Sequence, residues 1–481
     1  MLQVAPERTW SYYTAQVGHY VFEGLTHTEE DGRLVPGLAV SWTASADGRE
    51  YRFRLRAGVT FHDGTALTAG EVIRAWTTLL QEPPDSLTHP WMLDPIEGAL
   101  AFSSGFAPVV TGLRAADDST VVIRLEEPLA FFPTLLSHPQ AAIAAAASSP
   151  QHPMGTGPWR WIAGDSTELR FARHDGYWGG AAGLDSLSYR YVPDSLMAAA
   201  FNARWVDMAV ELPAATLTEW STRSDLGFVE SEARTTVRLV INMRDSVFQD
   251  IRVRRGLNLA VDIERLTQAM AAGSAIPAAG AIPPSLPGAD PRREPYGFDL
   301  AAARRLLREG GYPMARPLRL WVPAPGLSDF PADIGTLLRD YFEAVGLRVE
   351  LTVRSEGIET ALADGAADLA LTVWVGDYPD ADAFLYPLYH SSVAGAAGND
   401  GAYRNPAVDR LINATRRELD PTRRAELLRA ADQGLFDDVP VVFLWFTRSA
   451  TVYSLRLTGW GADPQMSMLR ALRLATGPST Q

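Results

Sequence analysis

Cysteine is absent from the 481-residue sequence. Its absence excludes disulfide bonds, thiolate metal sites, cysteine nucleophiles and a cysteine to which a lipid anchor could be attached. Long apolar runs are missing as well. The longest, Ala141 to Ala147, is far shorter than the about 20 residues that a membrane-spanning helix needs. We therefore expect no membrane insertion of this chain.

Clusters of basic residues are also missing. The chain has 43 Lys and Arg against 57 Asp and Glu, which gives a formal net charge of −14 at pH 7. Proteins that bind nucleic acid neutralise its phosphates with clustered Lys and Arg. No run of five or more basic residues occurs here, so we expect no nucleic acid among the partners.

Sequence motifs for catalysis and metal binding are equally scarce. None of the eight histidines lies in an H-E-x-x-H or H-x-H arrangement, and no Gly-x-Ser-x-Gly elbow or Walker loop occurs. His62, in a turn before Gly64, has two interpretations, a metal ligand or a turn histidine bonded to nearby backbone, and the second is favoured. We expect no enzyme, no cofactor and no metal site.

The patterns that are present indicate several lobes of mixed α/β structure. A length of 481 residues suggests about three lobes, at roughly 150 residues each. Residues 51–56 alternate apolar and basic, as in a half-buried strand. Thr68 to Glu71 form a capping box that opens a helix through Leu79. Gly155 to Pro158 are dense in turn residues and mark a boundary between lobes.

Strands and helices alternate after residue 236. Strand–helix–strand alternation predicts parallel pairing in an α/β lobe. The predicted helices are Val253–Leu259, Leu300–Arg308 (capped by Asp299) and Ile334–Val345. The predicted strands are Leu318–Val322, Leu347–Val353 and Asp368–Trp374.

A series of short segments spans nearly the whole chain. In order they are Phe22–Leu25, Pro36–Ala39 with Trp42, Asp47–Gly48 with Tyr51–Arg56, Phe61–Ala69, Gly155–Trp159, Asp175–Trp178, Asn242 with Phe248 and Asp250, Arg252–Arg254 with Ala260–Asp262, Trp374 with Gly376–Asp380, and Asn405–Pro406 with Asp409. One segment alone is a weak signal, but their order and spacing together are a strong one. The sequence resembles the extracytoplasmic solute-binding proteins for oligopeptides, dipeptides and nickel that serve ABC importers.

The resemblance implies a two-lobed α/β fold like that of periplasmic binding proteins, with an extra α+β domain inserted in the first lobe. Lobe I would comprise residues 1–30, 155–236 and 448–481. The extra domain would be 31–154 and lobe III 237–447. The chain would cross near Thr235–Asn242 and Trp445–Tyr453, and two crossing strands form a hinge for closure around a ligand.

Asp377 is the principal candidate for ligand binding. In peptide-binding members of the family the aspartate of this Gly-Asp segment pairs with the α-ammonium of the ligand. It follows an apolar strand, Leu369 to Val375, and such strand ends hold ligands in α/β sheets. The alternative is a turn-capping aspartate before Tyr378.

The other candidates share a place in the binding cleft of the resembling proteins: Val375, Gly376, Trp374, Trp445, Arg238, Tyr12, Tyr13 and Thr14. The first two would offer backbone groups to an extended ligand. Each tryptophan is either near the cleft or part of the core. Arg238 is either a partner for a ligand carboxylate or an exposed strand arginine. Tyr12–Thr14 either line the cleft or form a surface loop.

The resemblance implies the substrate-binding component of an ABC importer, a monomer that captures a small amine-bearing solute in a closing cleft and delivers it to the permease. Leu362, Leu371 and Val240 stand where oligopeptide binders have polar clamps, so a short peptide fits better than a long one. The alternatives are a relative recruited as a cytoplasmic sensor or biosynthetic enzyme, and a metal-chelate binder.

The residues Met1 to Pro6 have neither a basic region nor a following apolar core, which indicates no signal peptide in this sequence. We expect an extracytoplasmic protein, in the periplasm or on the cell surface, if a leader was removed. We expect a cytoplasmic one if Met1 is the native start.

Overall fold

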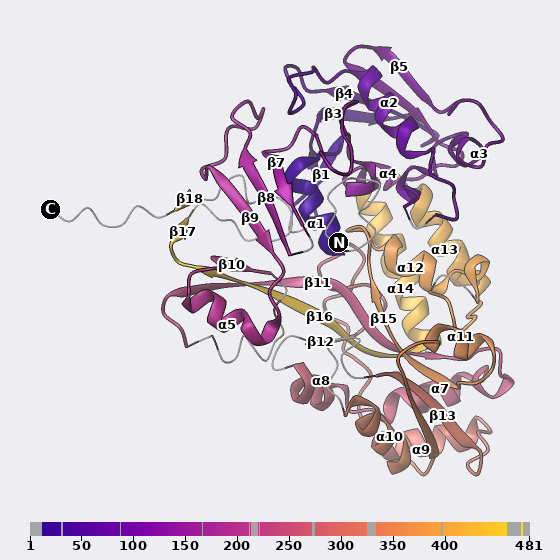
Figure 1. Ribbon diagram of the computed structural model, residues 1–481. Coiled ribbons are helices and arrows are strands. Elements are labelled where there is room, and N and C mark those ends of the chain that lie inside the picture. The colour runs from indigo at the N-terminus through magenta and orange to yellow at the C-terminus, as the bar shows by residue number, and fades with distance from the viewer. Residues whose placement is uncertain are drawn as a thin grey trace. The chain divides into compact units, whose positions relative to one another are not determined.

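The computed structural model describes residues 12–29, 32–86, 88–165, 167–210, 212, 220, 222–271, 275–324, 333–395, 398–458 and 473–474 (Figure 1). Two compact units are present. Unit 1 consists of Met1–Val210, Ser224–Val229 and Thr451–Gln481, and unit 2 of Glu211–Arg223 and Glu230–Ala450. Two strands, β11 (Leu226–Ile241) and β16 (Val441–Ser454), run through both units and overlap the predicted crossings. The finer division into lobe I and an extra domain stays a prediction.

Within the described residues, unit 1 contains four small antiparallel sheets, one of them the pair β17–β18. Strands β1 (Thr26–Thr28) and β2 (Leu34–Pro36) form a pair. A four-stranded sheet has the order β3-β4-β6-β5, and a three-stranded sheet has the order β7-β8-β9. Their bounds are β3 (Ala39–Ala44), β4 (Glu50–Leu55), β5 (Leu113–Asp117), β6 (Thr120–Arg124), β7 (Trp159–Gly164), β8 (Glu168–Arg173) and β9 (Ser186–Arg190).

The helices of unit 1 are short, and some lie against these sheets. They are α1 (Tyr12–Val21), α2 (Ala69–Leu79), α3 (Ala99–Ser103), α4 (Phe132–Leu135) and α5 (Asp194–Asn202), with 3-10 turns at Trp91–Leu93 and Pro139–Ala141. Three two-residue strands complete the part of unit 1 that the structure describes: β10 (Met208–Ala209), β17 (Leu457–Thr458) and β18 (Arg473–Leu474).

Helix α2 begins as the sequence predicts. The Thr68 side chain accepts a hydrogen bond from the Glu71 N–H at 3.3 Å. The reciprocal half of the capping box is replaced, because the Glu71 carboxylate accepts from Arg74 at 2.7 Å. One face of the helix, with Val72, Ala75, Trp76 and Leu79, is buried. The indole N–H of the fully buried Trp76 donates to the Ala141 carbonyl at 2.8 Å.

Unit 2 is built on the largest sheet, of order β10-β16-β11-β15-β13-β14, with β12 (Ala275–Pro277) also paired to β16. Strands β13 (Pro317–Pro323), β14 (Arg348–Arg354) and β15 (Leu369–Val375) are parallel, whereas β11 is antiparallel to β15. The predicted strands and their parallel pairing are confirmed. Parallel strands have their carboxyl ends at one edge of the sheet, so β15 delivers the residues after Val375 to that edge.

Helices cover the sheet of unit 2 (Figure 1). They are α7 (Ile251–Leu259), α8 (Ile263–Ala271), α9 (Leu300–Glu309), α10 (Ile334–Ala344), α11 (Ile358–Ala363), α12 (Asp382–Tyr389), α13 (Pro406–Arg417) and α14 (Pro421–Asp438), with 3-10 turns at Ser246–Phe248 and Ser391–Val393. The three predicted helices match α7, α9 and α10. Asp299 caps α9 as expected, accepting from the N–H groups of Ala301 and Ala302.

The core of unit 2 lies on one face of the sheet. It contains Val237, Leu239 and Ile241 of β11 with Leu369 and Leu371 of β15, packed with residues of α7 to α10. These alternate along their strands because successive side chains point to opposite faces. In the part of the chain that the structure describes, no helix is both long and apolar enough to cross a membrane.

His62 joins two segments of unit 1. Its Nε2 donates to the Gly157 carbonyl at 2.9 Å, its Nδ1 accepts from the Gly155 N–H at 3.4 Å, and its ring lies 4.9 Å from that of His174 at 85°. His62 is therefore bonded to backbone, as the favoured interpretation expects. Burial lowers the pKa of His62 to about 4, and burial also lowers the pKa of His174.

We predict that acid weakens unit 1 through His62. Its pKa is about 6.5 when unfolded and about 4 when folded, so stability is full above pH 6.5 and is lost as the pH falls toward 4. Between pH 6.5 and pH 4 the thermal midpoint should fall less in His62→Gln than in the wild type. Glutamine keeps an N–H for the Gly157 carbonyl but does not titrate. Equal falls in both proteins, followed by circular dichroism, would contradict the prediction.

Candidate ligand-binding site

Asp377 lies in the first turn after β15, at the carboxyl edge of the parallel strands. From Gly376 to Leu385 every residue is buried except Asp377, which is exposed. A carboxylate presented alone by a buried segment differs from an ordinary surface aspartate, whose neighbours are also solvated. The turn therefore exposes one charged side chain, while its neighbours in the sequence are buried.

Gly376 fixes the start of this turn. Its N–H donates to the Arg234 carbonyl at 2.7 Å, which extends the β11–β15 ladder by one bond. A Cβ at this position would lie 2.6 Å from the ring of Phe384, a fully buried side chain. No side chain larger than hydrogen fits there unless Phe384 moves, so the path of the backbone into Asp377 depends on glycine.

The Asp377 carboxylate has no hydrogen-bond or ion-pair partner among the described residues. A capping aspartate would accept a backbone N–H of its own turn, so the turn-capping interpretation is wrong. Although the residue is exposed, desolvation by the surrounding protein raises the pKa of Asp377 to about 6, and Arg234 offsets part of this rise. A charged group without a partner, whose pKa is raised in this way, is suited to receiving a cation.

Trp374 and Val375 occupy the last two positions of β15, and Gly376 separates them from Asp377. Val375 is 44% exposed and pairs with Thr235. Trp374 is half-buried. Its indole N–H donates to the Ala383 carbonyl in α12 at 2.8 Å, and this bond holds its ring in place. The structure thus brings four of the predicted residues, 374 to 377, into one strand end.

Among the residues that the structure describes, the outer edge of β15 has no paired strand near this strand end. Pairing with β13 extends only to the Trp321–Ala370 position, while pairing with β11 continues to Val375. Within the described residues, the last part of β15 is therefore paired on one side only. Val373, which the sequence analysis did not single out, is 39% exposed here. The sequence could have indicated this residue, because side chains alternate along β15 and Val373 therefore lies on the same face as Val375.

Arg238 is not an exposed strand arginine, because it is 2% exposed. It lies on β11 opposite Thr372, its Nη2 donates to the Gly398 carbonyl at 3.0 Å, and its guanidinium lies 5.7 Å from the Tyr389 ring centroid. These contacts tie the strand to the segment after α12. Its proposed pairing with a ligand carboxylate stays a prediction.

The remaining candidates are more distant from Asp377 in the chain. Trp445 of β16 is 5% exposed and belongs to the core of unit 2. Tyr12, Tyr13 and Thr14 form the first turn of helix α1 in unit 1, so the surface-loop alternative is wrong. Their roles in binding stay predictions.

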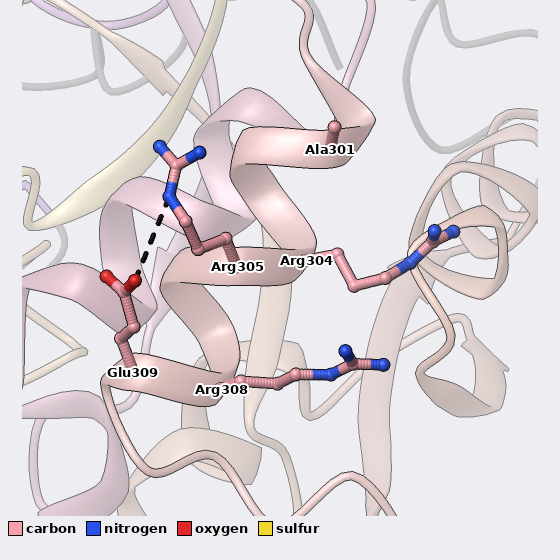
Figure 2. Close-up of a pocket in the computed structure, with 5 residues that line it drawn as sticks. All are labelled: Ala301, Arg304, Arg305, Arg308 and Glu309. Carbon is pink, nitrogen blue, oxygen red and sulfur yellow. Dashed lines mark ion pairs between the residues drawn. The ribbon is translucent and has the colours of Figure 1, made fainter.

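A shallow hollow on unit 2 lies on helix α9 and is lined by Ala301, Arg304, Arg305, Arg308 and Glu309. Figure 2 shows Arg305 turned toward Glu309 and Arg304 pointing away from them. Arg304 donates to the carbonyls of Ala344 and Val345 at the end of α10. One helix lines the hollow, and two of its three arginines have such partners, so its chemistry is that of a solvated helix face.

Comparison with known proteins places the chain among binding proteins. Residues 33–396 match the family model described as bacterial extracellular solute-binding proteins, family 5 Middle. The glutathione-binding protein GsiB of Pectobacterium atrosepticum is 28% identical over 460 residues, covering 92% of this chain and 86% of that protein.

Solved structures are similar over nearly the whole chain. HbpA2 from Haemophilus parasuis has a TM-score of 0.86 at 21% identity, covering 99% of this chain and 98% of that one. The dipeptide-binding protein from Pseudoalteromonas sp. SM9913 has a TM-score of 0.77 at 20% identity, covering 98% of each chain. These likenesses confirm the expected fold class, α/β and like that of periplasmic binding proteins.

The family match extends over more than half of the chain, from the β1–β2 connection to the segment after α12. The family consists of solute-binding proteins and not of enzymes. The expected function as the substrate-binding component of an importer is thereby confirmed. This chain belongs to the bacterial extracellular solute-binding proteins of family 5.

Proposed function

We propose that this protein captures a short peptide, or another small solute with a free amine, by pairing the ammonium of the solute with the Asp377 carboxylate. The observation that carries the proposal is the display of this carboxylate: exposed, without a partner among the described residues, and held on a buried turn. An ammonium would supply the missing charge and hydrogen bonds, and such charge-assisted bonds are the strong ones.

Two observations favour a short peptide: the residues at the positions of the long-peptide clamps, and the ligands of similar proteins. Leu362, Leu371 and Val240, which replace the polar clamps of long-peptide binders, are 0%, 0% and 3% exposed. They are therefore packed in unit 2 and offer no charge to a distant ligand carboxylate. One relative is a glutathione-binding protein, and one similar structure holds the dipeptide Met-Leu. Both ligands are short peptides with a free α-amine, which favours the same class here.

The edge of β15 that lacks a paired strand among the described residues supports a binding mode for such a ligand. A short extended peptide could pair its backbone with the edge beside Val375 while its ammonium reaches Asp377, as in strand addition to a sheet. Val373 and Val375, both partly exposed, would contact its side chains. Family membership further supports a location outside the cytoplasm, delivery to an ABC permease and no catalytic activity.

Asp377→Asn should abolish tight binding of amine-bearing peptides. Truncating one partner of an enclosed charge pair costs on the order of 2–5 kcal/mol, a loss of affinity of about thirtyfold or more. Binding of Met-Leu and of glutathione would be measured by calorimetry on protein stripped of bound solute by mild denaturation and refolding. Their N-acetylated forms, which lack the ammonium, should bind the wild type no better than the variant.

The matched control is Asp364→Asn, which removes another exposed carboxylate, at the end of α11 in the same unit. It should bind both peptides as the wild type does. If Asp377→Asn also binds both peptides with unchanged affinity, the carboxylate is not the ammonium partner and the proposal fails.

Affinity for these peptides should depend on pH with a midpoint near 6. Protonation of Asp377 removes the charge that attracts the ammonium, so affinity is nearly full at pH 7 and falls about tenfold between pH 7 and pH 5. The peptide amine stays protonated throughout this range. Burial also raises the pKa of Asp382 to about 6, so any dependence that survives in Asp377→Asn comes from another group, such as Asp382. A flat profile in the wild type would contradict the prediction.

A further inference from the structure

We propose that Asp380 and Arg424 are positioning residues for ligand binding, whose ion pair holds the turn that presents Asp377. The inference rests on the proposed function of Asp377 and adds to it the group that keeps its carboxylate in place. Neither residue faces the ligand in this proposal.

Asp380 and Arg424 form a close ion pair. Nη1 and Nη2 of Arg424 donate to the two carboxylate oxygens of Asp380, each at 2.7 Å, and Nε of Arg424 donates to the Thr415 carbonyl at 2.9 Å. The side chains are 13% and 9% exposed. A two-pronged arginine–carboxylate contact fixes orientation as well as distance, which a single hydrogen bond does not.

The pair closes the turn at its far end. Asp377 lies between two anchors, the Gly376 N–H bound to the Arg234 carbonyl and the Asp380 carboxylate bound to Arg424. Only Asp377, Tyr378 and Pro379 lie between these anchors. The Asp380 N–H donates to the Tyr378 carbonyl at 2.8 Å, which tightens the turn around the proline.

The same pair links the turn to three helices. Asp380 Oδ1 also accepts the Asp382 N–H at 2.8 Å, at the start of α12. Arg424 comes from α14, and the Thr415 carbonyl that it reaches belongs to α13. Tyr378 adds a second tie, because its hydroxyl donates to Asp382 Oδ2 at 3.1 Å. Loss of the Arg424 fork would therefore release the far anchor while the near anchor at Gly376 persists.

Unit 2 contains a second buried arginine–aspartate pair that serves as a matched control. Arg293 donates to Asp432 at 2.5 Å, with side chains 8% and 2% exposed. Asp432 is also on α14, but it holds the loop around Ala281, whose N–H it accepts at 2.7 Å. Arg293 reaches Asp432 through Nη1 alone, so only Arg424→Lys removes a two-pronged contact. In either pair Arg→Lys keeps the charge and should lower the thermal midpoint.

The test compares Arg424→Lys with Arg293→Lys in the full chain, alone and combined with Asp377→Asn. Met-Leu and glutathione serve as probes in calorimetry. We expect Arg424→Lys to weaken binding about tenfold and Arg293→Lys to change it less than twofold. In the Asp377→Asn background Arg424→Lys should cause no further loss, since a positioning pair acts only through the group that it positions.

A measurement without ligand gives an independent readout. Carboxyl-carbon NMR titration should show the pKa of Asp377 falling from about 6 toward the ordinary value of 3.8 in Arg424→Lys, as the released turn becomes better solvated. In Arg293→Lys it should not move. A role in folding stability alone would leave this pKa unchanged in both variants.

Each other outcome has one meaning. Wild-type affinity and an unmoved Asp377 pKa in Arg424→Lys overturn the inference and leave the proposed function standing. If Arg424→Lys also weakens binding in the Asp377→Asn background, the inference is overturned too, because the pair then affects binding through a group other than Asp377. If neither peptide binds the wild type, or if Asp377→Asn binds them normally, the proposed function fails, and the titration still decides whether the pair holds the turn.

Discussion

The register between β11 and β15 is the constraint on which unit 2 depends. Thr235 to Ile241 pair in sequence with Val375 to Leu369, so the apolar residues of both strands turn to the same face and build one core. A slip of one residue would move Leu369 and Leu371 to the opposite face. The same register sets where β15 ends and therefore where Asp377 emerges. Core packing and the place of the candidate site thus have a single structural cause.

Unit 1 is held by a different kind of constraint, a partly buried polar centre. The Glu23 carboxylate accepts hydrogen bonds from Thr156, Tyr177 and Trp178 at 2.7–2.9 Å, which joins three remote segments of the chain. Arg56 lies 4.0 Å over the Trp178 ring. These residues come from the short segments that carry the family resemblance. In unit 1 those segments serve to assemble the fold, whereas in unit 2 the Gly376–Asp380 segment forms the candidate site.

Local features of the sequence predicted much of this structure. The three helices predicted after residue 236 begin and end within about two residues of the prediction, because caps such as Asp299 and stops such as Gly310 act on the nearby backbone. Asp377 could be placed because an apolar strand precedes it. Arg424 could not, since its partner lies 44 residues away and the pairing depends on how α14 packs. The sequence predicts for Arg238 either a ligand contact or an exposed residue, because burial of an arginine depends on neighbours such as Tyr389 that lie far along the chain.

The position of β16 near the end of the chain has a consequence for biosynthesis. Val442, Leu444 and Trp445 belong to the core of unit 2, and the same strand pairs with β10 of unit 1 and with β12. The largest sheet, on which unit 2 is built, cannot be completed before this strand has left the ribosome. Contacts between residues so distant in sequence form slowly, because a long loop must close before they are made. Unit 2 therefore remains incompletely folded until late in its synthesis, and chaperones can act on it during that interval.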